Sequence, residues 1–165
     1  MKNQVVYSSM INPDIDKGKA DPIKDIGGAI GVAASEVMVS GNVPVHFASQ
    51  NFSISNTGVL FVGCDVVAGK INTTFHKNLL AFLRGIDPIH VKVVAVFSIL
   101  NSGKKSARKE IASILEPKGI KVEEDELLIK PPFFLSRKPF PSPEILNDAK
   151  AFGTRIMTKY RDEAR

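Results

Sequence analysis

Apolar residues along the chain gather in short runs that alternate with longer stretches of helical periodicity. The third and fourth of these runs are apolar at successive positions, which is typical of strands covered on both faces. Pro44 lies in the second run and favours an edge strand, because proline has no N–H for a neighbouring strand. The runs of strand length occupy residues 4–8, 43–48, 59–64 and 92–99, with a fifth inside residues 121–130.

Helical spacing of apolar residues fills the intervals between the runs. The expected helices cover residues 22–35, 73–84, 104–118 and 143–160. Asp21 before Pro22 and Ser142 before Pro143 are favoured helix starts. The Asp or Ser side chain can accept from the free N–H groups of the first turn, and proline at the first helical position gives up an N–H that would have no partner in the helix. Gly119 follows the third helix as its expected C-cap. The segment between the second and third strands leaves room only for a stunted helix.

The alternation of strands and helices predicts an α/β fold with right-handed crossovers and a mainly parallel sheet. We expect residues 1–165 to form a single domain: a doubly wound sheet of five parallel strands with helices on both faces. Ligands of such sheets lie beyond the carboxyl ends of the strands at the switch point. The sequence places three segments at those ends: Ser8-Ser9-Met10, Gly63-Cys64-Asp65 and Ser98-Ile99-Leu100.

Composition narrows the class of protein. Apolar residues make up 44% of the chain and charged residues 24%, which are ordinary globular values. The net charge of +5 favours anionic partners, but it is too small and too dispersed to indicate nucleic acid. The single cysteine, Cys64, excludes an internal disulfide. We found no signal peptide and no apolar stretch of membrane-spanning length, so we expect a cytoplasmic protein.

Several motifs, taken in order, resemble the flavodoxin family over nearly the whole chain. The opening VVYSS resembles that family's first strand and the start of its phosphate loop, and FHKNLLAFL is the closest single match. The remaining motifs are DIGGAIG at residues 25–31, FVGCDVVAGKI at 61–71, VVAVFSILNSGKKS at 93–106 and KPFPSPEILNDAKAFG at 138–153. The resemblance implies a flavodoxin-like fold with strand order 2-1-3-4-5.

The resemblance also implies FMN as the cofactor and electron transfer as the function, with the protein tuning the redox potential. The flavin phosphate would lie on the first loop and the N-terminus of the first helix, where free N–H groups and the dipole favour an anion. The loops after the third and fourth strands would hold the isoalloxazine ring. The implied cofactor-binding residues are Ser8, Ser9, Met10, Asp65, Val66, Val67, Ala68, Gly69, Ser98, Ile99, Leu100, Asn101, Ser102 and Gly103.

Two features depart from the family pattern. The T-G-N-T-type turn is absent, and Ala20-Asp21-Pro22-Ile23 stands in its place after a longer loop. Pro22 has no N–H to donate, and Asp21 as the N-cap would occupy the place of the anion and repel it. The ring-stacking aromatic residue after the third strand is also missing, and Val66 or Val67 stands there.

Individual polar residues allow more than one interpretation. Lys17 and Lys19 would either bind the phosphate or form a solvated loop face. Ser102 would contribute backbone to a flavin contact, cap the following helix, or do both. His76 is expected on the surface of its helix. The sequence contains no Ser-His-Asp arrangement and no metal-ligand pattern.

The sequence is compatible with three functions. The first is an FMN-binding carrier that passes electrons to a redox partner protein. Because electron-carrier flavodoxins are typically acidic, a basic one would need an acidic partner or an anionic small molecule. The second is an oxidoreductase of the same fold, similar to the flavodoxin-type protoporphyrinogen dehydrogenases, that acts on an anionic substrate. The third is a flavin-free binding module, for which the altered first loop and the missing aromatic are the evidence.

Overall fold

The computed structural model describes residues 2–10, 18–38, 42–133 and 136–161. Its sheet has the strand order β2-β1-β3-β4-β5, with all pairs parallel. This is the predicted order, with β2 at an edge as Pro44 indicated. A sixth strand, β6, also pairs with β4 in parallel, nearer the carboxyl end of β4 than β5 does. The strands are β1 (Lys2–Ser8), β2 (Val45–Phe47), β3 (Thr57–Val66), β4 (Val91–Leu100), β5 (Lys121–Val122) and β6 (Leu127–Ile129).

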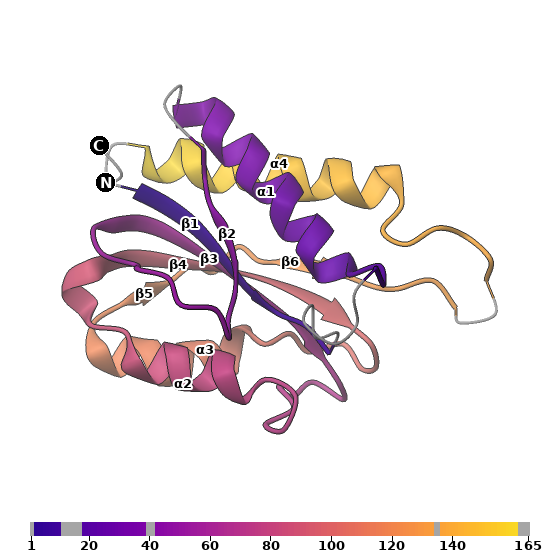
Figure 1. Ribbon diagram of the computed structural model, residues 1–165, viewed down its shortest axis with the longest axis horizontal. Coiled ribbons are helices and arrows are strands. Elements are labelled where there is room, and N and C mark those ends of the chain that lie inside the picture. Colours follow the sequence, from indigo (N-terminus) through magenta and orange to yellow (C-terminus); the bar gives the residue numbers. More distant parts are fainter. Residues whose placement is uncertain (1, 11–17, 39–41, 134–135, 162–165) are drawn as a thin grey trace.

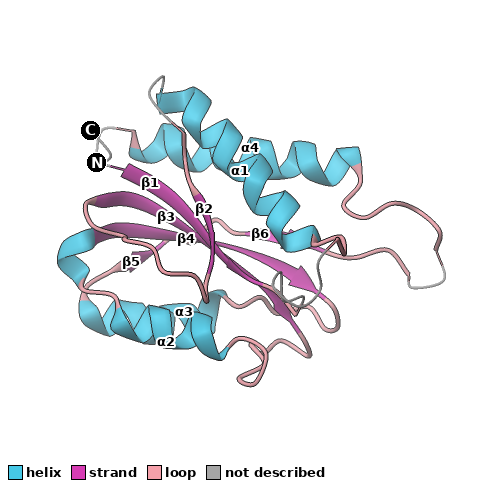
Figure 2. Ribbon diagram, in the orientation of Figure 1, coloured by secondary structure: helices cyan, strands magenta, loops and turns pink. Residues whose placement is uncertain are grey.

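Helices cover the sheet on both faces (Figures 1 and 2). One layer holds α1 (Pro22–Met38) and α4 (Pro143–Tyr160), and the other holds α2 (Lys77–Gly85) and α3 (Arg108–Leu115). Short 3₁₀ turns, η1 (Pro88–His90) and η2 (Glu116–Lys118), lie before β4 and before β5. The predicted doubly wound α/β fold is therefore confirmed. No helix in these described segments is long and apolar enough to cross a membrane.

The side chains of the central strands alternate between two apolar cores. Val5, Phe61 and Phe97 point into the core beneath α1 and α4. Val6 and Val62 point into the core beneath α2 and α3. Because successive side chains of a strand face opposite ways, a strand covered on both faces must be apolar at every position. This explains the continuous apolar runs of β3 and β4.

Two glycines permit close packing at these cores. A Cβ atom on Gly63 of β3 would lie 2.1 Å from the ring of Phe97 on β4. A Cβ atom on Gly153 of α4 would lie 2.7 Å from the carbonyl oxygen of Ile30 on α1. The second contact is with the backbone, which has no rotamer to change. Gly153 therefore determines how closely the two helices of that layer approach.

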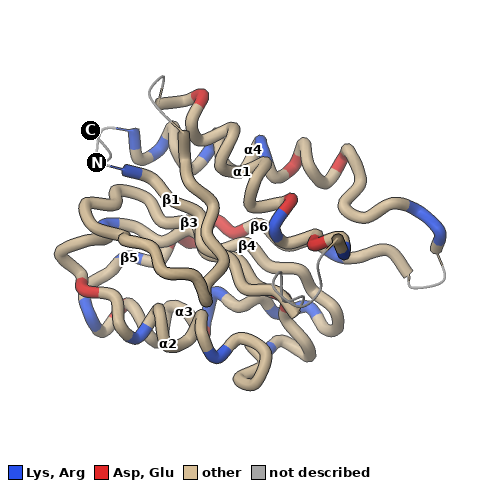
Figure 3. The backbone as a smooth tube through the Cα atoms, viewed as in Figure 1, with Lys and Arg blue, Asp and Glu red and all other residues tan. Residues whose placement is uncertain are grey.

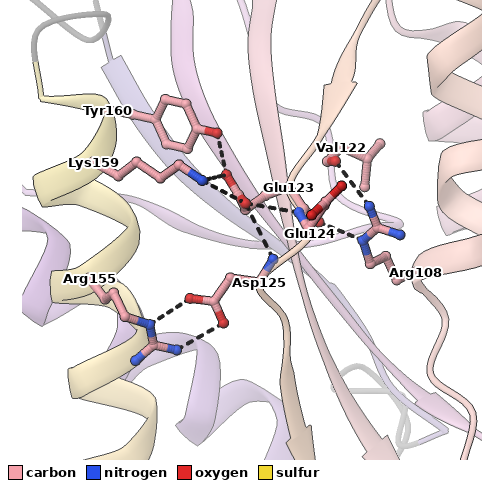
Figure 4. Close-up of polar contacts among 8 residues, drawn as sticks. All are labelled: Arg108, Val122, Glu123, Glu124, Asp125, Arg155, Lys159 and Tyr160. Atoms are coloured by element: carbon pink, nitrogen blue, oxygen red, sulfur yellow. Dashed lines mark hydrogen bonds and ion pairs between the residues drawn. The ribbon is translucent and has the colours of Figure 1, made fainter.

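The predicted fifth strand is divided by an acidic loop into β5 and β6. Glu123 starts this loop, and its side chain is buried at 2% exposure. It accepts hydrogen bonds from the Tyr160 hydroxyl, from Lys159 Nζ at 2.9 Å and from the N–H of Glu124 at 2.9 Å (Figure 4). Arg108 of α3 donates to the Glu123 carbonyl at 2.6 Å. Glu123 thus joins α3, α4 and the interrupted strand.

Candidate functional site

The strand ends predicted to meet do lie together at one edge of the sheet. Ser8 at the end of β1 pairs in register with Cys64 of β3. Cys64 in turn pairs with Ser98 of β4, followed by the pairs Asp65 with Ile99 and Val66 with Leu100. Since the strands are parallel, the loops after β1, β3 and β4 all leave from this edge. We call it the carboxyl edge.

Several of the predicted site residues lie within the core at this edge. The side chains of Val66 and Ser98 are fully buried, and Ile99 and Leu100 are 3% and 4% exposed. The Ser98 hydroxyl accepts a hydrogen bond from the N–H of Ala107, just before α3. These four residues support the loops of the edge from below, and any ligand above them meets the residues that follow them in the loops.

Ser8 is paired with a histidine that the sequence did not place here. Its hydroxyl oxygen lies 2.8 Å from Nδ1 of His76, and the side chains are 3% and 1% exposed. Burial lowers the pKa of His76, although the nearby backbone carbonyl of Asp65 acts in the opposite direction. The expectation of a surface position for His76 is therefore wrong.

The local reason for the buried histidine is a turn before α2. Asn72 Oδ1 accepts from the N–H groups of Thr74 and Phe75, at 2.9 and 3.1 Å. This Asx turn delays the helix until Lys77, beyond the predicted start. Phe75 is consequently 53% exposed rather than part of the apolar face, and His76 points inward.

Asp21 caps α1 as predicted, and it also forms a hydrogen bond with Ser9. Its carboxylate accepts from the N–H of Lys24 and from the Ser9 hydroxyl. The side chain is 8% exposed, and Oδ1 has no hydrogen-bond partner within the described part of the chain. Burial raises the pKa of Asp21, and nearby Asp25 adds to this effect, while the two hydrogen bonds oppose it.

A second carboxylate at the edge is Asp65, at the end of β3. Burial raises its pKa to about 6, and the charge of Asp21 adds to this effect. The N–H of Met10, at 3.4 Å, and the side chain of Asn101 act the other way. Asp65 therefore connects the loops after β1 and β4. Burial, Asp21 and Asp25 also raise the pKa of Tyr7 to about 12.

The loops after β3 and β4 are tied to each other. Val67 and Lys70 close a tight turn in which Ala68 and Gly69 have φ of 51° and 74°. The N–H of Ala68 donates to Ser102 Oγ at 2.7 Å, and the N–H of Asn101 donates to the Val66 carbonyl at 2.9 Å. Of the two roles considered for Ser102, the cap of the next helix is excluded, because α3 begins only at Arg108 and Ser102 instead accepts from Ala68.

Two apolar side chains are exposed on these loops. Met10 of the first loop is 45% exposed, and Val67 of the third-strand loop is 42% exposed. The tips Asn101, Ser102 and Gly103 are exposed as well. The carboxyl edge thus presents apolar surface beside polar backbone, the combination that an aromatic ring system requires.

A basic cleft of about 720 Å³ adjoins the edge on the β6 side. The loop after β4, with Asn101 and Lys104, forms one wall, and the segment Lys130 to Phe133 forms the other. Lys104 also lines a smaller neighbouring cleft with Arg108. Basic positions elsewhere lie over both helical layers (Figure 3). Lys104 and Lys130 thus line one cleft on a surface whose charges are otherwise mixed.

The described residues do not form a metal site, since no group of three or more His, Cys, Asp or Glu side chains comes together in them. Burial raises the pKa of the Cys64 thiol, so Cys64 is not an activated nucleophile. Of the two lysines considered for a phosphate, Lys19 is exposed, and Lys17 lies outside the described residues.

The edge fits the two halves of FMN unequally. The exposed side chains of Met10 and Val67, with the tips of the loops, suit the ring. The phosphate finds fewer donors, because the Ser8 hydroxyl is paired with His76, and the Ser9 hydroxyl and the Lys24 N–H are bonded to Asp21. The described part of the site therefore fits a flavin ring and does not fit a phosphate at α1.

Comparison with solved structures identifies the fold. A flavodoxin from the domain Archaea matches with a TM-score of 0.67 over 98% of this chain and 99% of its own, at 21% identity. Rubredoxin oxygen:oxidoreductase from Desulfovibrio gigas matches with a TM-score of 0.67 over 98% of this chain and 36% of its own, at 15% identity. The flavodiiron protein from Giardia intestinalis matches with a TM-score of 0.68 over 99% of this chain and 37% of its own, at 12% identity.

At these identities the similarity establishes the architecture alone. The chain has a flavodoxin-like fold, as its motifs predicted. No family model matches its sequence, and no curated protein matches it either.

Proposed function

We propose that the protein binds a flavin at the carboxyl edge and takes part in electron transfer. The observation that carries the proposal is the exposed pair Met10 and Val67 beside the loop of Asn101 to Gly103, on a flavodoxin-like fold. The names of the structural neighbours, a flavodoxin, a flavodiiron protein and an oxidoreductase, support it. FMN is the flavin that the sequence resemblance implies.

In this proposal the ring lies against the loops after β3 and β4. The tips Val67, Ala68 and Gly69 and the tips Asn101, Ser102 and Gly103, which are hydrogen-bonded to each other, would together form the surface that the ring meets. The flavin supplies the redox chemistry, and the protein influences its potential through polarity and charge near the ring. Asp65 contacts Met10 and Asn101 of the neighbouring loops, so its charge is placed to exert that influence.

The basic cleft supports an acidic redox partner. Lys104 and Lys130 stand beside the loop that would contact the ring. Complementary charge speeds encounter and orients a partner, and its effect falls with added salt. An acidic partner protein docked there would approach the ring from the β6 side.

The test is a titration of the flavin-free protein with FMN, followed by quenching of flavin fluorescence and by the visible spectrum. Val67→Glu should weaken flavin binding at least about tenfold, because the bound ring would then bury a charged carboxylate that has no partner. Ile89→Glu is the matched control, since Ile89 is 72% exposed in η1, away from the carboxyl edge. Absence of flavin binding by the wild-type protein would refute the proposal.

A flavin-free binding module is the second candidate, and the occupied α1 terminus favours it. It predicts neither quenching nor bound colour, with an anionic ligand in the basic cleft instead. An oxidoreductase acting on an anionic substrate remains the third. Steady-state turnover of a carboxylated tetrapyrrole with bound flavin would distinguish that enzyme from an electron carrier.

A further inference from the structure

The N-terminus of α1 is where an α/β protein commonly binds an anion, because free N–H groups and the helix dipole meet there. In this chain the first helical residue is Pro22, which has no N–H. The N–H of Lys24, two residues on, is bonded to Asp21. The protein's own carboxylate therefore uses the donor that a phosphate would need.

The neighbouring donors are used in the same way. The Ser9 hydroxyl bonds to Asp21, and the Ser8 hydroxyl pairs with His76. No hydroxyl from the end of β1 is left for a second anion. Each of these pairings is made between groups that are at least nine-tenths buried.

The hydrogen-bonding capacity of the Asp21 carboxylate is not fully used. Asp21 is 8% exposed, yet Oδ1 has no hydrogen-bond partner among the described residues. Asp65 and Asp25 lie close enough for their charges to act on Asp21 or to be acted on by it. A phosphate arriving here would meet three carboxylates and would have to displace one of them.

We infer that Asp21 is a built-in substitute for a ligand phosphate, so that the flavin recognised at this edge is bound by its ring alone. Asp21 then acts as a specificity-determining residue that makes riboflavin as good a ligand as FMN. The flavin part of this inference rests on the proposed function. The closed phosphate position does not, because it concerns only the protein's own groups.

The first experiment tests the position with inorganic phosphate, monitored by ³¹P NMR line broadening. Asp21→Ser removes the carboxylate and keeps a good N-cap, so the helix start is preserved. We expect this variant to bind phosphate at least about tenfold more tightly than the wild type. Asp148→Ser is the control: it makes the same charge change at an exposed position on α4, and it should bind phosphate like the wild type.

The second experiment compares riboflavin with FMN. The wild type should bind both with similar affinity, and Asp21→Ser should shift the ratio towards FMN by about tenfold. Asp21→Asn, which removes the charge without changing the shape, should shift it in the same direction by less. Circular dichroism confirms that each variant is folded, and the isosteric Asn variant keeps the test available if the Ser variant unfolds.

Two results would overturn the inference. One is a wild-type protein that binds FMN more than about tenfold more tightly than riboflavin. The other is an Asp21→Ser variant that gains no phosphate binding over the wild type. If neither flavin binds, the proposed function fails, and the phosphate titration still decides the role of Asp21.

Discussion

Two carboxylates that are buried in the described part of the chain, Glu123 and Asp21, have hydrogen-bonding surroundings of opposite effect. Glu123 and Asp21 are 2% and 8% exposed. Burial alone would raise the pKa of Glu123, but the hydrogen bonds from Tyr160, from Lys159 and from the N–H groups of Asp125 and Glu124 lower it to about 2. For Asp21 the effect of burial prevails, and the pKa is raised.

This difference separates a structural carboxylate from one placed at a functional edge. Glu123 has a donor for each oxygen and connects three elements, so its charge is an integral part of the fold. Among the described residues, Asp21 has one oxygen without a hydrogen-bond partner, and it lies near a second carboxylate of raised pKa. Groups whose pKa is raised by burial and like charge concentrate at functional sites. Burial by itself therefore does not distinguish the two roles, whereas hydrogen bonding does.

The largest effect should come from Glu123→Gln. The amide cannot accept at both ends, so the Tyr160 hydroxyl or Lys159 loses a charged partner. Breaking a buried charged network in this way should lower the free energy of unfolding by about 3 kcal/mol. Urea denaturation measures the loss. Glu124→Gln, the exposed neighbour, should be close to wild type, and equal losses in both variants would contradict the special role of Glu123.

The next prediction concerns pH. The pKa of Glu123 is lowered from 4.5 to about 2, so its stabilisation is present above pH 4.5 and is lost as the pH falls towards 2. The pKa of Asp65 is raised from 3.8 to about 6, so the folded state binds the extra proton between these values. The contribution of Asp65 is therefore present below pH 3.8 and is lost as the pH rises to 6.

Thermal unfolding between pH 4 and pH 6 tests the pH dependence that comes from Asp65. Asp65→Asn should remove a pH-dependent contribution of about 2 kcal/mol, leaving a flatter profile than that of the wild type. The exposed Asp148→Asn on α4 serves as the control and should leave the profile unchanged. A profile of Asp65→Asn parallel to the wild type would show that Asp65 does not titrate in this range.

Loss of the buried Ser8–His76 contact should have a smaller effect on stability than Glu123→Gln and a larger one than a change at Asp21. Ser8→Ala removes the hydroxyl 2.8 Å from Nδ1 and leaves a buried ring nitrogen without that partner. The expected cost is about 1.5 kcal/mol in urea denaturation. Ser55→Ala, an exposed serine in the loop before β3, should cost much less. A loss in Ser8→Ala no greater than in Ser55→Ala would indicate that the pair does not stabilise the fold.

The limits of sequence-based prediction follow the same division. The sequence predicts α4 with its bounds, because Ser142, Pro143 and the apolar stripe are local signals, and Ser142 Oγ does accept from Ile145. It predicts one fifth strand where the structure has β5 and β6. Lys159 and Tyr160, the partners of Glu123 on α4, are distant in sequence, so the acidic run at residues 123–126 does not by itself predict the contacts made at the break.

The same holds at the candidate site. The ends of β1, β3 and β4 are predicted, because apolar runs and strand order follow from local patterns and general rules. The inward turn of His76 and the use of Ser102 by Ala68 depend on pairings across 68 and 34 residues. The Asx turn at Asn72 is the one local signal that would have shifted the start of α2 and placed His76 inside.

The smallest effect on stability should come from Asp21→Asn, and this sharpens the comparison most. Asparagine caps a helix about as well as aspartate, so the start of α1 is kept. The variant loses a buried charge whose ionised form is disfavoured, so the free energy of unfolding at pH 7 should rise by up to about 1 kcal/mol. Urea denaturation of Asp21→Asn and Glu123→Gln gives the contrast directly. The same change from carboxylate to amide should stabilise the fold at Asp21 and destabilise it at Glu123. A clear loss of stability in Asp21→Asn would mean that both carboxylates are structural and that the carboxyl edge owes nothing to the charge of Asp21.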